Sequence, residues 1–247
     1  MSPIVADTEE RRPLVAAALT MNLGMLALQD ALYSQQAPPT AEQRQEILAH
    51  PMRSRDLLAA RGVTDSAWLD AVAHHHEMID GSGYPGRLSG EALDHGARAL
   101  ALCDQYCAVV SERAHRPAVL PTVALRKLFL QKGTFDPSMS ALLLREMGLY
   151  PPGTLLRLAN GDTAIALKHG PDPSHPIVRA LLSSRGTRLE GYPKRSTRNQ
   201  AFAIQEAVPM TQLRIEVDFP ALWADATRIE RSEEHTSELQ SLRHLVC

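Results

Sequence analysis

The residues near position 75 combine two side-chain types that often surround metal ions in proteins. His74, His75 and His76 are consecutive, and Glu77 and Asp80 follow them closely. Neutral imidazoles are common ligands for iron, manganese and zinc, so adjacent histidines at a helix end could approach one ion. The two carboxylates could accept hydrogen bonds from the ring N–H groups and orient the rings. Because solvated histidine clusters also occur without metal, this run needs support from elsewhere in the chain.

The elements expected around this run are helices. Leu14–Leu32 has apolar residues at helical spacing and no internal proline, which predicts one helix. Residues 40–43, Thr-Ala-Glu-Gln, have the sequence of a capping box, and the helix that they open carries His50. Either residue of the pair 65–66 is expected to cap the helix 67–76, which ends at the histidines. A glycine-rich loop at 80–90 and further helices at 93–112, 122–131 and 137–147 complete this part.

After residue 150 the pattern changes to short apolar runs separated by turn residues. Asn160-Gly161 lies between Leu155–Leu158 and Thr163–Leu167, and both turn residues tolerate positive φ, which predicts a β-hairpin. We therefore expect a helical domain at 1–149 and a small β-rich segment at 150–230. Further strands are expected at Ile177–Leu182, Ala201–Glu206 and Leu213–Val217.

Composition excludes several classes of protein. The 247 residues carry a formal net charge of −2, which gives no basic field for nucleic acid or an anionic membrane. We see no apolar run near the roughly 20 residues that span a bilayer, and no secretory signal at the start. Three cysteines do not make a disulfide framework, so a cytoplasmic location is expected. The tail 231–247 resembles a translated sequencing adapter, which we exclude from the fold.

The histidine run continues into a longer motif. His75-His76-Glu77-Met78-Ile79-Asp80-Gly81-Ser82-Gly83-Tyr84-Pro85 resembles the HHExxDGxGYP signature of the HD-GYP family. The likeness extends to residues 96–104, 113–116, 135–137 and 148–153. The fold class that it implies is mainly α, an HD-type helical bundle followed by the small β-rich C-terminal segment.

The resemblance also implies an activity and a site. HD-GYP proteins are cyclic-di-GMP phosphodiesterases that hold two or three iron or manganese ions and release pGpG or GMP. Two close cations lower the pKa of the attacking water and neutralise phosphoryl charge. Carried over by motif, the metal ligands are His50, His75, His76 and Asp104, and the ligand-binding residues are Tyr84, Arg113 and Arg116. Glu77, Asp80, Gly81, Gly83 and Pro85 are supporting positions of the same motif.

The chain departs from the family where the HD pair and its lysine are expected. Met21, Asn22 and Met25 occupy these positions, and Gly24 alone is kept. An amide oxygen is a poorer ligand than a carboxylate for a hard divalent ion, and Met25 supplies no cation. We expect the two methionines to be core residues, and one divalent ion, iron or manganese, at most. Cys103 and Cys107, on either side of Asp104, are expected to be small buried residues.

Three functions remain open at this point. A degenerate domain could bind cyclic-di-GMP or a related nucleotide as a regulatory module, which we favour. It could instead be an active metal-dependent phosphodiesterase with an unusual site. A third alternative is a protein-interaction module that contacts a signalling partner through the Gly-Tyr-Pro loop.

Overall fold

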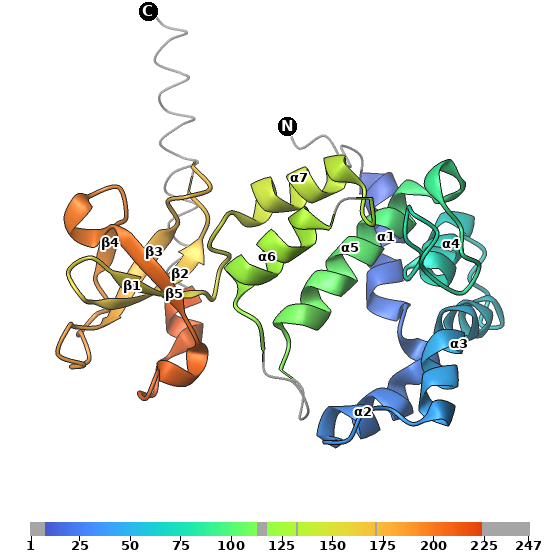
Figure 1. Cartoon of the computed structure of the whole chain (residues 1–247), viewed down its shortest axis with the longest axis horizontal. Helices are drawn as coiled ribbons and strands as arrows, with labels where there is room; N and C mark the ends of the chain where they lie inside the picture. Colours follow the sequence, from blue (N-terminus) through green and yellow to red (C-terminus); the bar gives the residue numbers. More distant parts are fainter. Residues whose placement is uncertain (1–7, 113–117, 132, 171, 224–247) are drawn as a thin grey trace, which may run out of the picture. The chain divides into compact units, whose positions relative to one another are not determined.

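The computed structural model describes residues 8–112, 118–131, 133–170 and 172–223 (Figure 1). The chain divides into two compact units. The first comprises Met1–Val119 and Val123–Leu143, and the second comprises Leu120–Thr122 and Leu144–Cys247. Each unit is described by itself.

Up to residue 147, the described part of the chain consists of helices and the loops that join them. Thr40 and Gln43 form the predicted capping box, in which the Gln43 N–H donates to Thr40 Oγ1 at 3.2 Å. Of the two expected caps, Asp65 is the one used, and its carboxylate accepts from the Trp68 N–H at 3.1 Å. The helices are α1 Thr8–Thr20, η1 Leu23–Met25, α2 Leu26–Ser34, α3 Ala41–Ala59, α4 Ser66–His74, η2 Gly90–Ala92, α5 His95–Val110, α6 Pro121–Leu130 and α7 Pro137–Met147.

The core of the first unit lies where α1, α3, α4 and α5 meet. Small side chains allow these helices to approach closely, because a short residue on one helix leaves room for a longer one on its neighbour. The same core fixes the direction in which α4 delivers the histidines at its end. Its buried members are Ala17, Leu58, Ala71, Val72 and Leu100.

The prediction of one helix over Leu14–Leu32 is wrong, since the chain breaks between α1 and α2. The break occurs where Gly24 lies against α3: its N–H donates to Ser54 Oγ at 2.9 Å. A Cβ at Gly24 would lie 2.8 Å from the His50 carbonyl oxygen and 2.9 Å from the Ser54 nitrogen. A backbone contact this close needs glycine and a local departure from regular helix.

The apolar segment Arg11–Ser34 corrects a second expectation. It is long and apolar enough to cross a membrane by length and composition alone, which is weak support for a span. In the structure the segment is divided by η1 and by the turn before it. Several of its large side chains are exposed, including Val15, Leu19 and Leu26.

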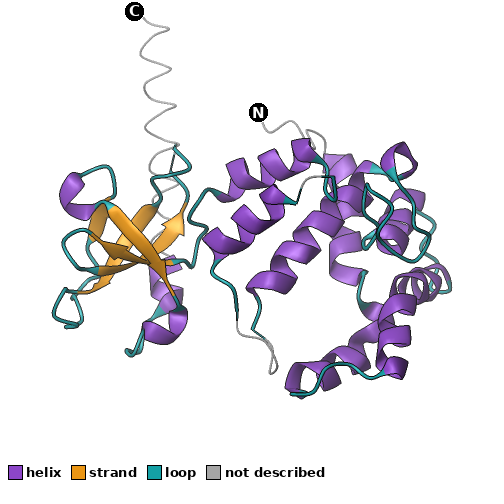
Figure 2. Cartoon of the chain, in the orientation of Figure 1, coloured by secondary structure: helices purple, strands orange, loops and turns teal. Residues whose placement is uncertain are grey.

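The second unit contains a five-stranded antiparallel sheet with the order β4-β3-β2-β1-β5 (Figure 2). Its first hairpin is the predicted one: Gly161 has φ +84°, and the Leu158 N–H donates to the Asp162 carbonyl at 2.9 Å. Leu155 and Leu156 belong to two different apolar clusters, as expected for neighbouring residues on opposite faces of a sheet. The strands are β1 Leu155–Leu158, β2 Thr163–Lys168, β3 Ile177–Leu182, β4 Lys194–Ser196 and β5 Ile204–Val208.

Two strand predictions in this unit need correction. The run Ala201–Glu206 begins as the short helix η3, Gln200–Phe202, and becomes β5 only from Ile204. Leu213–Val217 is not a strand; Leu213, Ile215 and Val217 pack on one face of the sheet as irregular chain. Alternating apolar residues can pack on a sheet without strand pairing, so this pattern does not fix the backbone. The tail 231–247 lies outside the described residues.

Candidate functional site

Three histidines from two helices meet in one cluster. His50 lies in the middle of α3, His75 is the C-cap of α4, and His76 follows it. One ring nitrogen of each residue lies within 4.8 Å of the others. The Nε2 atoms of His50 and His75 are 3.1 Å apart, and the ring centroids of His75 and His76 are 4.2 Å apart. The structure thus brings together three of the four predicted metal ligands.

Backbone carbonyls orient two of these rings. His50 Nδ1 is 2.6 Å from the Ile47 carbonyl oxygen, and His75 Nδ1 is 2.7 Å from that of Val72. A carbonyl only accepts, so each Nδ1 carries the hydrogen and each Nε2 presents a lone pair toward the other ring. Glu77 and Asp80, which were expected to orient the rings, instead accept hydrogen bonds from Gly86 and Leu88 and from Ser82.

Burial keeps these rings uncharged at neutral pH. Desolvation lowers the pKa of His50 and lowers that of His75 to about 4. Desolvation, with the neighbouring His75 and His50 adding to it, lowers the pKa of His76 to about 2. Buried imidazoles lose the hydration that stabilises the charged form. Neutral rings with free lone pairs are the form that binds a metal ion.

Asp104, the fourth predicted ligand, lies beside the cluster on α5. Its Oδ2 is 3.7 Å from His76 Nδ1, which places the carboxylate at the edge of the histidine group. Cys103 and Cys107 are both exposed, so the prediction that they are buried is wrong. Helix α5 buries the face that carries Leu100 and Tyr106, and the two thiols lie away from it.

The Gly-Tyr-Pro loop is tied to the histidines through Glu77. The Glu77 side chain is only 1% exposed, and it accepts hydrogen bonds from the N–H groups of Gly86 and Leu88. Gly83 crosses the main chain at His76–Met78 so closely that a Cβ would lie 2.5 Å from three of its backbone atoms. Glu77 and Gly83 therefore serve the shape of the loop.

Tyr84 connects the loop to the cluster. Its ring stacks on that of His76, with centroids 4.7 Å apart and planes inclined by 26°. Burial, and secondarily Asp104, raises the pKa of its hydroxyl, so the group stays protonated. A stacked, protonated phenol next to a histidine cluster can donate a hydrogen bond to a bound ligand.

The remaining supporting residues close the base of the loop. Asp80 accepts from the N–H and hydroxyl of Ser82, and Gly81 has φ +75°, a region that favours glycine. Arg98 donates to the Gly90 and Leu93 carbonyls and pairs with Asp136 at 3.3 Å. The loop is thereby held to α5 and to the start of α7.

The three positions that differ from the family motif surround the break after α1. Met21 packs against the core with Trp68 and Leu69, as expected for a structural residue. Asn22 and Met25 are half-buried and precede η1 and α2, and neither makes a side-chain cap. Arg113 and Arg116, the predicted phosphate contacts, lie outside the described residues.

A cavity of about 450 Å³ opens along the outer side of the loop. Its lining includes Tyr84 and one residue that sequence analysis missed, Arg87. Arg87 is exposed and has φ +53°, which is uncommon for a residue with a side chain. No local sequence signal reveals this, because the loop closure sets the backbone angle. The other lining residues are Leu48, Gly81, Ser82, Gly83 and Pro85.

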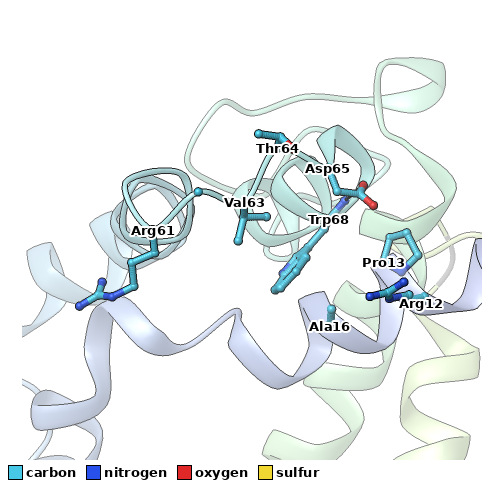
Figure 3. A pocket seen from close by; sticks show the side chains of 9 residues that line it. Arg12, Pro13, Ala16, Arg61, Val63, Thr64, Asp65 and Trp68 are labelled. Atoms are coloured by element: carbon cyan, nitrogen blue, oxygen red, sulfur yellow. Dashed lines mark hydrogen bonds between the residues drawn. The ribbon is translucent and has the colours of Figure 1, made fainter.

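A second cleft, of about 380 Å³, lies between α1 and the connection from α3 to α4 (Figure 3). Trp68 lines it, and its Nε1 donates to Thr20 Oγ1 at 2.8 Å. Arg12 and Arg61 also line it, but Arg61 points away from the Trp68 ring in Figure 3. Its polar groups do not converge on one point, and we assign it no ligand.

The histidine cluster and the Gly-Tyr-Pro loop lie within the part of the chain that matches a known protein family. The family model described as "HD domain" matches residues 5–139. The chain belongs to the HD domain family. Its Gly-Tyr-Pro motif identifies it as an HD-GYP domain.

Known relatives of this HD-GYP domain are longer proteins. "Cyclic di-GMP phosphodiesterase PA4108" of Pseudomonas aeruginosa is 33% identical over 171 residues, which are 68% of this chain and 41% of the relative. "Cyclic di-GMP phosphodiesterase response regulator RpfG" of Xanthomonas campestris pv. campestris is 33% identical over 141 residues, 56% of this chain and 37% of the relative. The chain thus spans less than half the length of these two relatives.

A solved structure, of "Bd1817, a HDG"Y"P protein from Bdellovibrio bacteriovorus", aligns with a TM-score of 0.47 and 18% identity. The alignment covers 56% of this chain and 44% of that one.

The histidine cluster fits the divalent metal that the family implies. Both Nε2 lone pairs of His50 and His75 face each other across 3.1 Å with no hydrogen between them. Two such lone pairs repel unless a cation lies between them or a proton is taken up, and burial opposes the proton. Roughly 3 Å is also the separation of two nitrogens that each bind one ion at about 2.1 Å.

Proposed function

We propose that this chain is a degenerate HD-GYP domain that binds cyclic-di-GMP, or a closely related nucleotide, in bacterial second-messenger signalling. The observation that carries the proposal is the combination of an intact histidine cluster with a changed HD position. His50, His75 and His76 converge within 4.8 Å, whereas Met21 is packed into the core. One half of the family site is kept, and the other half lacks its ligands.

In this proposal the three histidines hold a single divalent ion, iron or manganese, with Asp104 beside them. When bound, the ion supplies a positive charge for a phosphate oxygen and lowers the pKa of a coordinated water. Tyr84 holds the ring of His76 by stacking and offers a hydroxyl donor. The chain itself offers no carboxylate at Asn22 to bridge a second ion.

Hydrolysis is therefore expected to be impaired while binding persists. Phosphodiester cleavage in this family depends on two close cations, and removal of one cation takes away several kcal/mol of transition-state stabilisation. Binding needs only the cavity, the loop and groups that attract phosphate. The exposed free thiols of Cys103 and Cys107 accord with a cytoplasmic location for this function.

A working phosphodiesterase is the second candidate. Three neutral imidazoles beside a carboxylate would hold one ion and leave room for a coordinated water. The relatives named above are phosphodiesterases by name.

One experiment separates the two candidates. The chain is purified anaerobically with Mn(II) or Fe(II), and cyclic-di-GMP binding and hydrolysis are measured on the same sample beside an active relative. We expect binding with no pGpG or GMP over many hours. Product that disappears in His75→Ala would establish the enzyme instead, and no binding at all would reject both candidates.

A further inference from the structure

We infer that Arg87 is the residue that contacts a phosphate of the bound nucleotide from the Gly-Tyr-Pro loop. The inference rests on the proposed function and adds a specificity-determining residue to it. Arg87 lies in the wall of the 450 Å³ cavity together with Tyr84, whose ring stacks on His76. Tyr84 thus contacts both the cavity that Arg87 lines and the histidine cluster.

The backbone around Arg87 is held in place by a buried carboxylate. Glu77 accepts hydrogen bonds from the residues on either side of Arg87, Gly86 and Leu88. These two N–H groups point inward to the same carboxylate, so Arg87 lies at the apex of the turn. Because Glu77 is 1% exposed, water does not compete for its oxygens.

The backbone conformation of Arg87 costs conformational free energy that an arginine in an ordinary conformation would not. At φ +53° a side chain is disfavoured relative to glycine, and residues in such conformations cluster at ligand sites. The surrounding loop contains glycines at 81, 83, 86 and 90, so glycine is readily used here. The presence of arginine at this strained position at the apex of the turn indicates that its side chain has a function.

The guanidinium is available for a ligand. Arg87 is exposed, and within the described part of the chain its side chain makes no hydrogen bond or ion pair. The Glu77 carboxylate beneath the same turn accepts from the main-chain N–H groups of Gly86 and Leu88. Guanidinium binds phosphate oxygens through two parallel hydrogen bonds, which suits a nucleotide phosphate better than it suits a neutral group.

The cavity offers a complementary environment for the rest of a nucleotide. Leu48 is 50% exposed there and presents an apolar side chain opposite the loop. Pro85 and Tyr84 add flat, rigid surface on which a base can lie. Arg87 also supplies a positive charge that the chain lacks at Met25.

Two substitutions distinguish the effect of the Arg87 guanidinium from the effect of its backbone conformation. Arg87→Gly removes the charge and suits the positive φ, so the loop is expected to keep its shape and the melting temperature to stay equal or rise. Arg87→Gln removes the charge and leaves the strain. Both are expected to weaken cyclic-di-GMP binding about tenfold or more, as for loss of a charged hydrogen bond. Arg87→Lys should fall between them and the wild type.

The test is calorimetric titration of the whole chain with cyclic-di-GMP, with chromatography to check that the ligand stays intact. Arg126→Gln is the matched control, because Arg126 is an exposed arginine on α6 outside the cavity. Wild-type affinity in Arg87→Gly would overturn the inference and leave the proposed function standing. Absence of binding by the wild-type chain would overturn the proposed function itself.

Discussion

The Nε2 atoms of His50 and His75 face each other at 3.1 Å, while both Nδ1 atoms donate hydrogen bonds to main-chain carbonyls. The two rings come from residues 25 positions apart, on α3 and at the end of α4. The Nδ1 hydrogens of these two rings are directed away from the contact, so the facing Nε2 atoms present lone pairs to each other. This preorganised arrangement leads to the first prediction.

His75→Ala should abolish metal binding, because it removes one of the three rings that converge on the site. We expect the wild-type chain to retain about one Mn(II) or Fe(II) after desalting, and the variant to retain none. Metal content is measured by mass spectrometry. His95→Ala, an exposed histidine at the start of α5, is the control and should retain the ion. Equal metal content in both variants would place the ion elsewhere.

The same cluster makes the metal-free protein sensitive to acid. Desolvation holds the folded-state pKa of His75 at about 4 and that of His76 at about 2, below the ordinary 6.5. The unfolded chain therefore binds protons before the folded chain does. The stability contributed by the neutral rings is present above pH 6.5 and is lost as the pH falls, down to about 4 for His75 and about 2 for His76.

Urea unfolding in EDTA at pH 7 and pH 5 measures this effect. We expect the free energy of unfolding to fall by about 3–4 kcal/mol between the two, with each of the two rings contributing about 2 kcal/mol. His75→Gln removes one titrating ring and should reduce the dependence by about half. A free energy that does not change with pH would show that the rings are protonated or solvated in the folded protein.

Gly83→Ala should damage the loop far more than Gly86→Ala. A Cβ at Gly83 meets three main-chain atoms at 2.5 Å, whereas one at Gly86 meets a side-chain oxygen of Glu77 at 3.1 Å. We expect a loss of about 1–3 kcal/mol for Gly83→Ala and a smaller loss for Gly86→Ala. Hydrogen exchange at the Leu88 amide reports whether its bond to Glu77 survives. Equal protection in the two variants would contradict the close crossing.

Restoring the family residues should add a second metal. The triple change Met21→His, Asn22→Asp and Met25→Lys is expected to raise the metal content from one to two per chain and to produce hydrolysis of cyclic-di-GMP. Because Met21 packs in the core, stability should fall by about 1–3 kcal/mol. A folded triple variant that holds two ions and stays inert would mean that His50, His75 and His76 are not a usable half of the family site.

Local sequence predicted the features that depend on a few neighbouring residues. The capping box at Thr40, the Asp65 cap and the hairpin at Asn160-Gly161 are such cases, since each is a contact within a few positions. The three histidines could be assigned from motif because the family spacing encodes their convergence. Helix α7, Pro137–Met147, has the bounds that its sequence predicts.

Features that depend on contacts between distant segments could not be predicted. The break after α1 arises where Gly24 meets α3, about 30 residues further along the chain. Whether Cys103 and Cys107 are exposed depends on which side of α5 the other helices cover. Glu77 changes from an expected ring partner to a loop support because its N–H donors come together only when the loop closes.

The close contact of Gly24 with α3 has a consequence for redesign. It fixes the main chain beside Met21, Asn22 and Met25 against the helix that carries His50. Because this contact uses none of the three side chains, they can be exchanged as a set while the backbone frame next to His50 stays in place.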